Sequence, residues 1–275
     1  MSRLNLEWVE NNFRNKNSVI YDIGCGDVSD QSLRLKFTLP DATVYSFECS
    51  RKWQAYNHQA AKNYGLNYIH KAVSYQDGKK TFTEGFTDYS GTLTDIKSLD
   101  HDRVQDSHTV ETISINTFCQ THPAPDLLQI ITEKDEYNII KSISKSILPS
   151  VIWLANTKFY NDENYIRCIP FSALKEYLEQ NNYHVTELEY DILCVKKHLQ
   201  LTEYQHIEQR HTHWTDHEKK IQEKIWLLRY NIVKSDGHDT WPELYKLQDW
   251  FDLPNETKTM INNVTDLTPN DLFSS

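Results

Sequence analysis

Several features that mark common protein classes are missing from this chain of 275 residues. No hydrophobic run approaches the roughly 18 residues that a membrane-spanning helix needs. The N-terminal segment, MSRLNLEW, lacks the apolar core of a secretory signal peptide. We therefore expect a cytoplasmic protein that has no membrane partner.

Cysteine is scarce, and its five occurrences are scattered at positions 25, 49, 119, 168 and 194. No two of them have the spacing of a zinc knuckle, so the sequence offers no common cysteine-based metal site. An odd number without a repeated spacing is also unlike the disulfide framework of a secreted domain. We expect reduced thiols and no bound metal.

Basic residues are in the minority, with 29 Lys and Arg against 39 Asp and Glu, which gives a formal net charge of −10. Nucleic acids and anionic membranes are bound through positively charged patches, and no such patch stands out in the sequence. We therefore expect no nucleic-acid partner. A small molecule is the expected ligand.

Glycine is scarce as well, with seven residues in all, so two of them in one turn are informative. Residues 18–27 read SVIYDIGCGD: an apolar strand that contains Asp22, followed by Gly24, Cys25 and Gly26. Glycines in such a turn let backbone N–H groups approach a ligand without a Cβ in the way. The pattern favours an adenosyl cofactor. The alternative is a plain strand-to-helix turn with a solvated Asp22.

A second acid, Glu48, ends the next apolar run, VYSFE, near the ~20-residue offset at which such folds hold a ribose hydroxyl pair. A nicotinamide-binding turn would need a third glycine where this chain has Ser29. S-adenosylmethionine is therefore the predicted cofactor. Cys25 and Cys49, which follow the two strand ends, are expected to line its pocket.

Strand and helix signals alternate along most of the chain. Parallel strands are expected at residues 19–23, 43–48, 67–73, 127–132 and 151–155, with antiparallel closing strands at 183–188 and 191–196. Helices are expected at residues 4–13, 29–37, 51–64, 135–147 and 171–181, and a hairpin strand at 80–86. This alternation predicts an α/β fold with a Rossmann-like, doubly wound, mostly parallel sheet.

Ligands of such sheets bind at the carboxyl ends of the strands. Asp22, Glu48, Val73 and Glu133 each stand at the end of a predicted strand, so we expect these side chains to converge. Ala72 and Val73 are accordingly predicted to contact the cofactor.

The sequence divides into a domain at residues 1–198 and a helical, aromatic-rich extension at 199–275. Apolar residues recur in this extension at helical spacing, at Ile221, Ile225, Leu228 and Ile232. We expect the extension to pack on the core or on a second copy of the chain, as a homo-oligomer. The histidines in residues 206–217 form no consistent ligand set and are interpreted as a solvated polar surface.

The first domain resembles the FkbM-type family of S-adenosylmethionine-dependent methyltransferases. The resemblance rests on YDIG at 21–24, YSFE at 45–48, KAVSYQDG at 71–78, ISINTF at 113–118 and DLLQIITEKDE at 126–136. It implies a class I methyltransferase fold, S-adenosylmethionine as cofactor, and methylation of hydroxyl groups on sugars or small molecules.

The last of these segments departs from the family pattern at three positions. Gln129, Ile131 and Lys134 stand where the family has Lys, Asp and Gly, whereas the acids Glu133 and Glu136 are kept. The cofactor side of the motif set is thus better preserved than the acceptor side.

Glu133 is the candidate catalytic base, because it follows the fourth parallel strand and could take the proton of an acceptor hydroxyl. Its alternative role is a solvated acid in the first turn of the next helix, where the helix dipole favours a negative charge. His70 is a weaker candidate for the base. Two functions therefore stay open: an active O-methyltransferase, or a degenerate cofactor-binding fold that serves as an interaction module.

Overall fold

The structure is a computed structural model, which describes residues 4–14, 16–28, 31–85, 91–93, 104–132, 135–155, 171–187 and 191–204. Residues 205–275 lie outside the described residues, and with them most of the expected helical extension and the whole of the histidine-rich segment. Glu133 and Lys134 also lie outside them.

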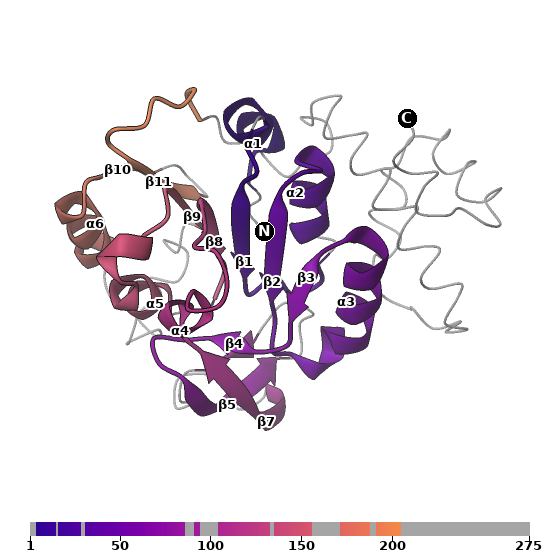
Figure 1. Cartoon of the computed structure of the whole chain (residues 1–275). Helices are drawn as coiled ribbons and strands as arrows, with labels where there is room; N and C mark the ends of the chain where they lie inside the picture. The colour runs from indigo at the N-terminus through magenta and orange to yellow at the C-terminus, as the bar shows by residue number, and fades with distance from the viewer. Residues whose placement is uncertain are drawn as a thin grey trace.

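Seven strands in the described part of the chain form the main sheet, in the order β10-β11-β9-β8-β1-β2-β3 (Figure 1). Their bounds are β1 Val19–Ile23, β2 Thr43–Phe47, β3 Asn67–Ile69, β8 Leu127–Ile130, β9 Val151–Ala155, β10 Tyr183–Glu187 and β11 Asp191–Lys196. Strands β3, β2, β1, β8 and β9 are parallel, whereas β11 is antiparallel to both β9 and β10. The parallel strands follow the 3-2-1-4-5 order of doubly wound folds, which confirms the predicted fold class.

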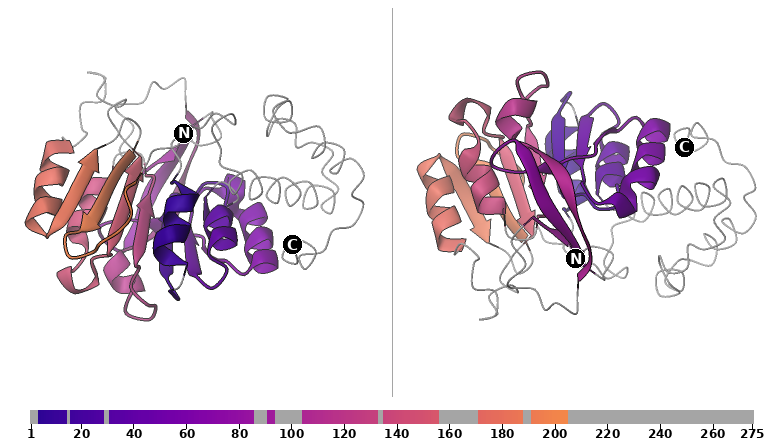
Figure 2. Two further views of the ribbon diagram at one scale, coloured as in Figure 1. Left: turned by 90° about the horizontal axis from the view of Figure 1, so that it is seen from above. Right: turned by 90° about the horizontal axis from the view of Figure 1, so that it is seen from below.

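Helices cover both faces of this sheet (Figure 2). They are α1 Leu6–Phe13, α2 Ser32–Thr38, α3 Arg51–Tyr64, α4 Ile115–Phe118, α5 Glu136–Ser142, the short 3-10 helix η3 Lys145–Ile147, and α6 Phe171–Gln180. Because successive strand residues point to opposite faces, Ile20 and Val44 pack with α1, α2 and α3, whereas Tyr21 and Tyr45 pack with α4, α5 and α6. The core thus has two layers, one on each side of the sheet.

A second, smaller sheet lies below the carboxyl ends of β1, β2 and β3 in the view of Figure 1. It contains β4 Ala72–Val73, β5 Gly78–Gly85, β6 Gly91–Thr92 and β7 Val104–Ile113, in the order β4-β7-β5-β6. The prediction of a single strand at 67–73 was wrong, because the chain turns after β3. At this turn, the N–H of Lys71 donates to the carbonyl of Ile69 at 2.9 Å. Beyond that turn, β4 pairs with β7 instead of continuing the main sheet.

Helices α3 and α5 show how local contacts decide where a predicted helix ends. Helix α3 has the predicted bounds, and its last turn closes on Gly65, whose φ is 69°. Helix α5 is shorter than the predicted 135–147 because Asn116 binds its end. The Nδ2 of Asn116 donates to the carbonyl of Ser142 at 2.7 Å, and its Oδ1 accepts the N–H of Ser144 at 2.9 Å.

The segment that follows β11 lies against α1. The indole N–H of Trp8 donates to the carbonyl of Thr202 at 2.8 Å, and the Thr202 N–H donates to Asn12 Oδ1 at 3.0 Å. The ring of Tyr204 meets that of Trp8 edge-on, with 5.3 Å between the centroids. The first residues assigned to the extension therefore pack on the domain. Within the described ranges, no helix has the length and apolarity to span a membrane.

Candidate functional site

The glycine turn follows β1 directly and is pressed against the end of β8. Gly24 and Gly26 have φ values of 72° and 55°, which side chains with a Cβ rarely adopt. A Cβ on Gly24 would stand 2.1 Å from the carbonyl oxygen of Ile131, so no other residue fits without moving the backbone. The sequence therefore needs glycine here to bring β1 and β8 together at their carboxyl ends.

Glu48, just after β2, ties this turn to the start of α3. Its Oε2 accepts the N–H of Gly26 at 2.8 Å, and its Oε1 accepts the N–H groups of Cys49 at 2.8 Å and Ser50 at 2.7 Å. Burial raises the pKa of Glu48, although these three N–H groups act in the opposite direction. The two residues that carried the cofactor prediction are thus brought together by a direct hydrogen bond.

Asn57 of α3 holds the other side of the turn, and sequence reasoning missed it. Its Nδ2 donates to the carbonyl of Gly26 at 2.8 Å, and its Oδ1 accepts the N–H of Val28 at 3.1 Å. The side chain is fully buried. The available signal was a polar residue on the apolar face of an amphipathic helix, between Tyr56 and Ala60.

Asp22 lies beneath the turn and is fully buried, so the alternative of a solvated Asp22 is wrong. The Ser32 hydroxyl donates to its Oδ2 at 2.5 Å, and Gln129 Nε2 donates to its Oδ1 at 3.0 Å. Ser46 in turn donates to Ser32 at 2.7 Å. This chain of polar contacts crosses β2, β1 and β8 and fixes the three strand ends relative to one another.

The remaining predicted cofactor contacts are all buried near this edge. Cys25 and Cys49 are each 6% exposed, and burial raises the pKa of both thiols, so they stay protonated at neutral pH. Ala72 and Val73 are buried in β4, hence in the second sheet rather than at the end of β3.

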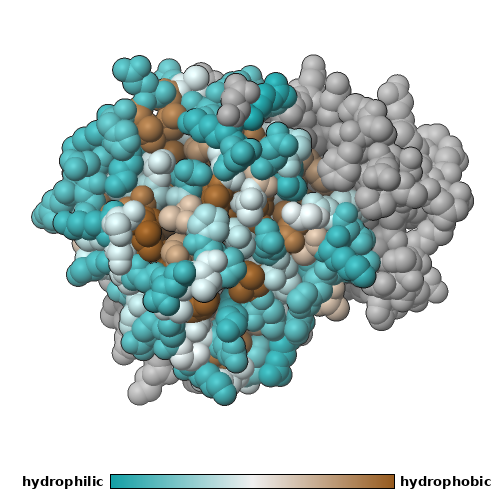
Figure 3. All heavy atoms as spheres, viewed as in Figure 1, coloured by the Kyte–Doolittle hydropathy of each residue, from teal (hydrophilic) through white to brown (hydrophobic). Residues whose placement is uncertain are grey.

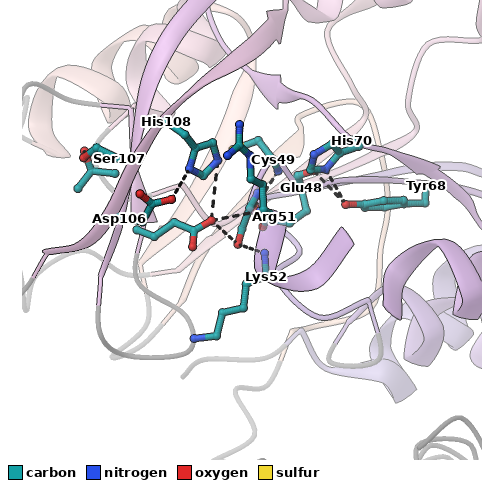
Figure 4. Close-up of polar contacts among 12 residues, drawn as sticks. Glu48, Cys49, Arg51, Lys52, Tyr68, His70, Asp106, Ser107 and His108 are labelled. Atoms are coloured by element: carbon teal, nitrogen blue, oxygen red, sulfur yellow. Dashed lines mark hydrogen bonds and ion pairs between the residues drawn. The ribbon is translucent and has the colours of Figure 1, made fainter. Parts of the chain in front are cut away.

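A polar cluster from the second sheet adjoins Glu48, and no sequence pattern predicted it (Figure 4). Glu84 of β5 accepts the Ser50 hydroxyl at 2.9 Å and the Arg51 N–H at 3.1 Å, at the start of α3. His108 of β7 lies 3.9 Å from Glu84 and 3.2 Å from Asp106. Glu84 thereby joins the second sheet to the helix that follows the candidate site.

His70, just after β3, lies beside Glu48 (Figure 4). Its Nδ1 is 3.1 Å from the carbonyl oxygen of Glu48 and 3.1 Å from the Tyr68 hydroxyl. Burial lowers the pKa of His70, which favours the neutral imidazole. These contacts make His70 a partner of the backbone at Glu48.

The segment that follows β8 is described only in part. The proposed base, Glu133, lies outside the described residues. Glu136, one turn further on, is described: burial raises its pKa to about 7, while hydrogen bonds from Thr132 oppose the shift. Across the described ranges, no group of three His, Cys, Asp or Glu side chains has a geometry that could hold a metal ion.

The fold is similar to those of several methyltransferases of known structure. A precorrin-6y C5,15-methyltransferase from Geobacter metallireducens is 14% identical, with a TM-score of 0.40 over 69% of this chain and 85% of that one. The Streptomyces achromogenes O-methyltransferase TomG, bound to S-adenosylmethionine, is 12% identical, with a TM-score of 0.42 over 70% of this chain and 76% of that one. A Podospora anserina methyltransferase bound to S-adenosylhomocysteine is 17% identical, with a TM-score of 0.40 over 66% and 72%.

No protein-family model and no curated protein matches the sequence. Because the TM-scores lie below 0.5, the fold assignment rests on the strand order of the sheet and not on these similarities.

Proposed function

We propose that this chain binds S-adenosylmethionine and transfers its methyl group to a hydroxyl of a small molecule or sugar. The observation that carries the proposal is the hydrogen bond between Gly26 and Glu48, at the carboxyl ends of the adjacent parallel strands β1 and β2. The glycine turn also lies beside the place where the strand order reverses, between β1 and β8. Doubly wound sheets bind their ligands at this place.

The residues around the glycine turn and Glu48 suit an adenosyl cofactor. A carboxylate offers about four acceptor sites, and Glu48 uses three of them for backbone N–H groups, which leaves room for a ribose hydroxyl. Gly26 would let the backbone approach the cofactor closely, Gly24 lets β8 close against the turn, and Cys25, Cys49, Ala72 and Val73 would form apolar walls.

When bound, the cofactor supplies an electrophilic methyl group, so the protein has mainly to orient the acceptor. Glu133 would take the proton of the attacking hydroxyl, as a general base beside the end of β8. Ile131 stands where the resembling family has a second acid, and a single carboxylate is a poor site for a divalent cation. We therefore propose a metal-free O-methyltransferase of the FkbM type that departs from its family on the acceptor side.

A second candidate function is an interaction module that keeps the fold without the chemistry. It is favoured by Gln129 and Ile131, which replace charged residues of the family pattern at the end of β8. In this alternative, the C-terminal extension would supply the contact surface for another copy or another protein.

A methyl-transfer assay separates the two functions. We would measure transfer from labelled S-adenosylmethionine to a panel of sugars and polyols, with and without a chelator. Glu133→Gln keeps the size of the side chain but removes the base, so it should lower turnover about 10²–10⁴-fold and leave cofactor affinity near normal. Glu179→Gln on α6 is the matched control. Full activity of Glu133→Gln, or complete loss with the chelator, would refute the proposed chemistry, and cofactor binding without turnover would favour the module.

A further inference from the structure

An open cleft of about 350 Å³ lies between the β4–β5 connection and α5, lined by Tyr75, Asn138, Lys141 and Ser142. It is a shallow depression open to solvent, so a ligand would lie at the surface between these side chains. Tyr75 follows β4 by two residues, and the other three belong to α5, which begins shortly after the end of β8. Tyr75 thus follows the two β4 residues predicted to contact the cofactor, and α5 follows the segment that contains the proposed base, Glu133.

Tyr75 forms a fixed aromatic wall of this cleft. Its side chain is 44% exposed, and no other large hydrophobic side chain in the described part of the chain is classed as exposed. The ammonium of Lys80 lies 4.1 Å from the ring centroid and also donates to the Ser74 hydroxyl at 2.7 Å. Lys80 does not line the cleft, so it holds the ring from outside. An exposed aromatic face attracts the polarised C–H groups of a sugar ring.

The opposite wall is polar and carries one cation. Lys141 lies on the exposed side of α5, with its ammonium 5.3 Å from the Tyr137 ring. Asn138 donates to Asp135 at 3.0 Å and Ser142 donates to the carbonyl of Ile139 at 2.7 Å, which leaves their oxygens able to accept hydrogen bonds. The ammonium of Lys141 can pair with an anionic group on a ligand, and this local attraction acts against the net charge of −10 that the chain carries.

We propose that this cleft binds an anionic sugar, whose ring stacks on Tyr75 and whose carboxylate or phosphate lies at Lys141. The assignment rests on the proposed function, because it identifies this sugar as the methyl acceptor. Figure 3 shows that the visible face of the molecule is mostly hydrophilic, with hydrophobic residues in separate patches. A broad protein-docking surface would need a larger continuous apolar area.

Binding of sugars to the full chain, without cofactor, tests this proposal. Ligand-observed NMR titrations would use D-glucuronate, glucose 6-phosphate and glucose. We expect the better of the two anionic sugars to bind at least tenfold more tightly than glucose, and its identity tells a carboxylate site from a phosphate site. Lys141→Gln should bring it down to the level of glucose. Tyr75→Ala should weaken all three sugars at least tenfold.

Lys79→Gln is the matched control, since Lys79 is an exposed lysine of β5 that neighbours Lys80 but does not line the cleft. It should leave all three affinities unchanged. Unaltered binding in Lys141→Gln and Tyr75→Ala, or no binding of any of the three sugars, would overturn the proposal. Because the titrations contain no cofactor, a chain that binds the anionic sugar but not S-adenosylmethionine would refute the proposed function while keeping the sugar site.

Discussion

The two sides of the candidate site, at β1–β2 and at β8, differ in how many of their polar atoms have hydrogen-bond partners. On the β1–β2 side, the carboxylate of Glu48 accepts three N–H groups and the amide of Asn57 makes two hydrogen bonds to the glycine turn. On the β8 side, two buried oxygens have no hydrogen-bond partner within the described residues: Gln129 Oε1 and Asp135 Oδ2.

An unpaired buried polar atom costs about 1–3 kcal/mol, and native proteins keep few of them. The glycine turn itself is therefore held by paired polar groups, whereas the β8 side keeps acceptors that a ligand or a water molecule can use. The first side also has unpaired atoms, since both amide atoms of Gln31, at the start of α2, lack a partner within the described residues. Three departures from the pattern of the family that the sequence resembles, at Gln129, Ile131 and Lys134, fall on the β8 side. The comparison indicates that the glycine turn is under tighter structural constraint than the end of β8.

The largest expected effect is on the framework side. Gly24→Ala should lower the free energy of unfolding by about 3–5 kcal/mol, because it combines a left-handed φ with a backbone clash at the Ile131 carbonyl. Gly65→Ala is the control, with a similar φ of 69° but only the end of the Lys36 side chain nearby, at 3.9 Å. It should cost about 1–2 kcal/mol. Equal losses in urea unfolding would show that the approach of β8 to the turn is not a constraint.

A somewhat smaller effect is expected for the clamp on the turn. Asn57→Ala leaves the N–H of Val28 and the carbonyl of Gly26 without their partner and should cost about 2–3 kcal/mol. Asn63→Ala, on the same helix, removes only an exposed contact with Gln59 and should change stability by less than about 0.5 kcal/mol. Thermal unfolding of the two variants would measure the difference. If they unfold alike, the turn does not depend on α3.

The acceptor side should show the smallest effect, and one that depends on pH. Glu136 has a folded-state pKa of about 7, raised from 4.5, so its protonated form is favoured on folding. Its contribution to stability is therefore present below pH 4.5 and lost as the pH rises through 7.

Glu136→Gln resembles the protonated acid. Its free energy of unfolding, relative to that of the wild type, should rise by on the order of 1–2 kcal/mol between pH 4.5 and pH 8. Unfolding measured across this range, with the exposed Glu176→Gln as control, would test the sign. A constant difference between wild type and Glu136→Gln would contradict the burial of this acid.

The parts of the fold that the sequence predicted well are those set by local patterns. The strands at 19–23, 151–155 and 191–196 and the helix at 51–64 have their predicted bounds, because apolar runs and end signals such as Gly65 mark them. The second sheet was missed because its long strand, β7, is polar and pairs with β5 and β4 across a wide gap in sequence.

The same contrast holds for the candidate site. Gly24, Gly26 and Glu48 stand at strand ends and could be recognised from spacing alone. Asn57 and Glu84 reach the site from a helix face and from a different sheet, so only the three-dimensional arrangement reveals them.

A calorimetric titration of S-adenosylhomocysteine onto the wild type and Glu48→Ala tests the central claim most directly. The account predicts saturable binding to the wild type, one ligand per chain. Glu48→Ala should weaken it about ten- to a hundredfold, the effect of losing a charge-assisted contact of roughly 1.5–3 kcal/mol. No binding to the wild type, or equal affinity for a Glu48→Ala variant that remains folded, would contradict the assignment of the glycine turn and Glu48 as the cofactor site.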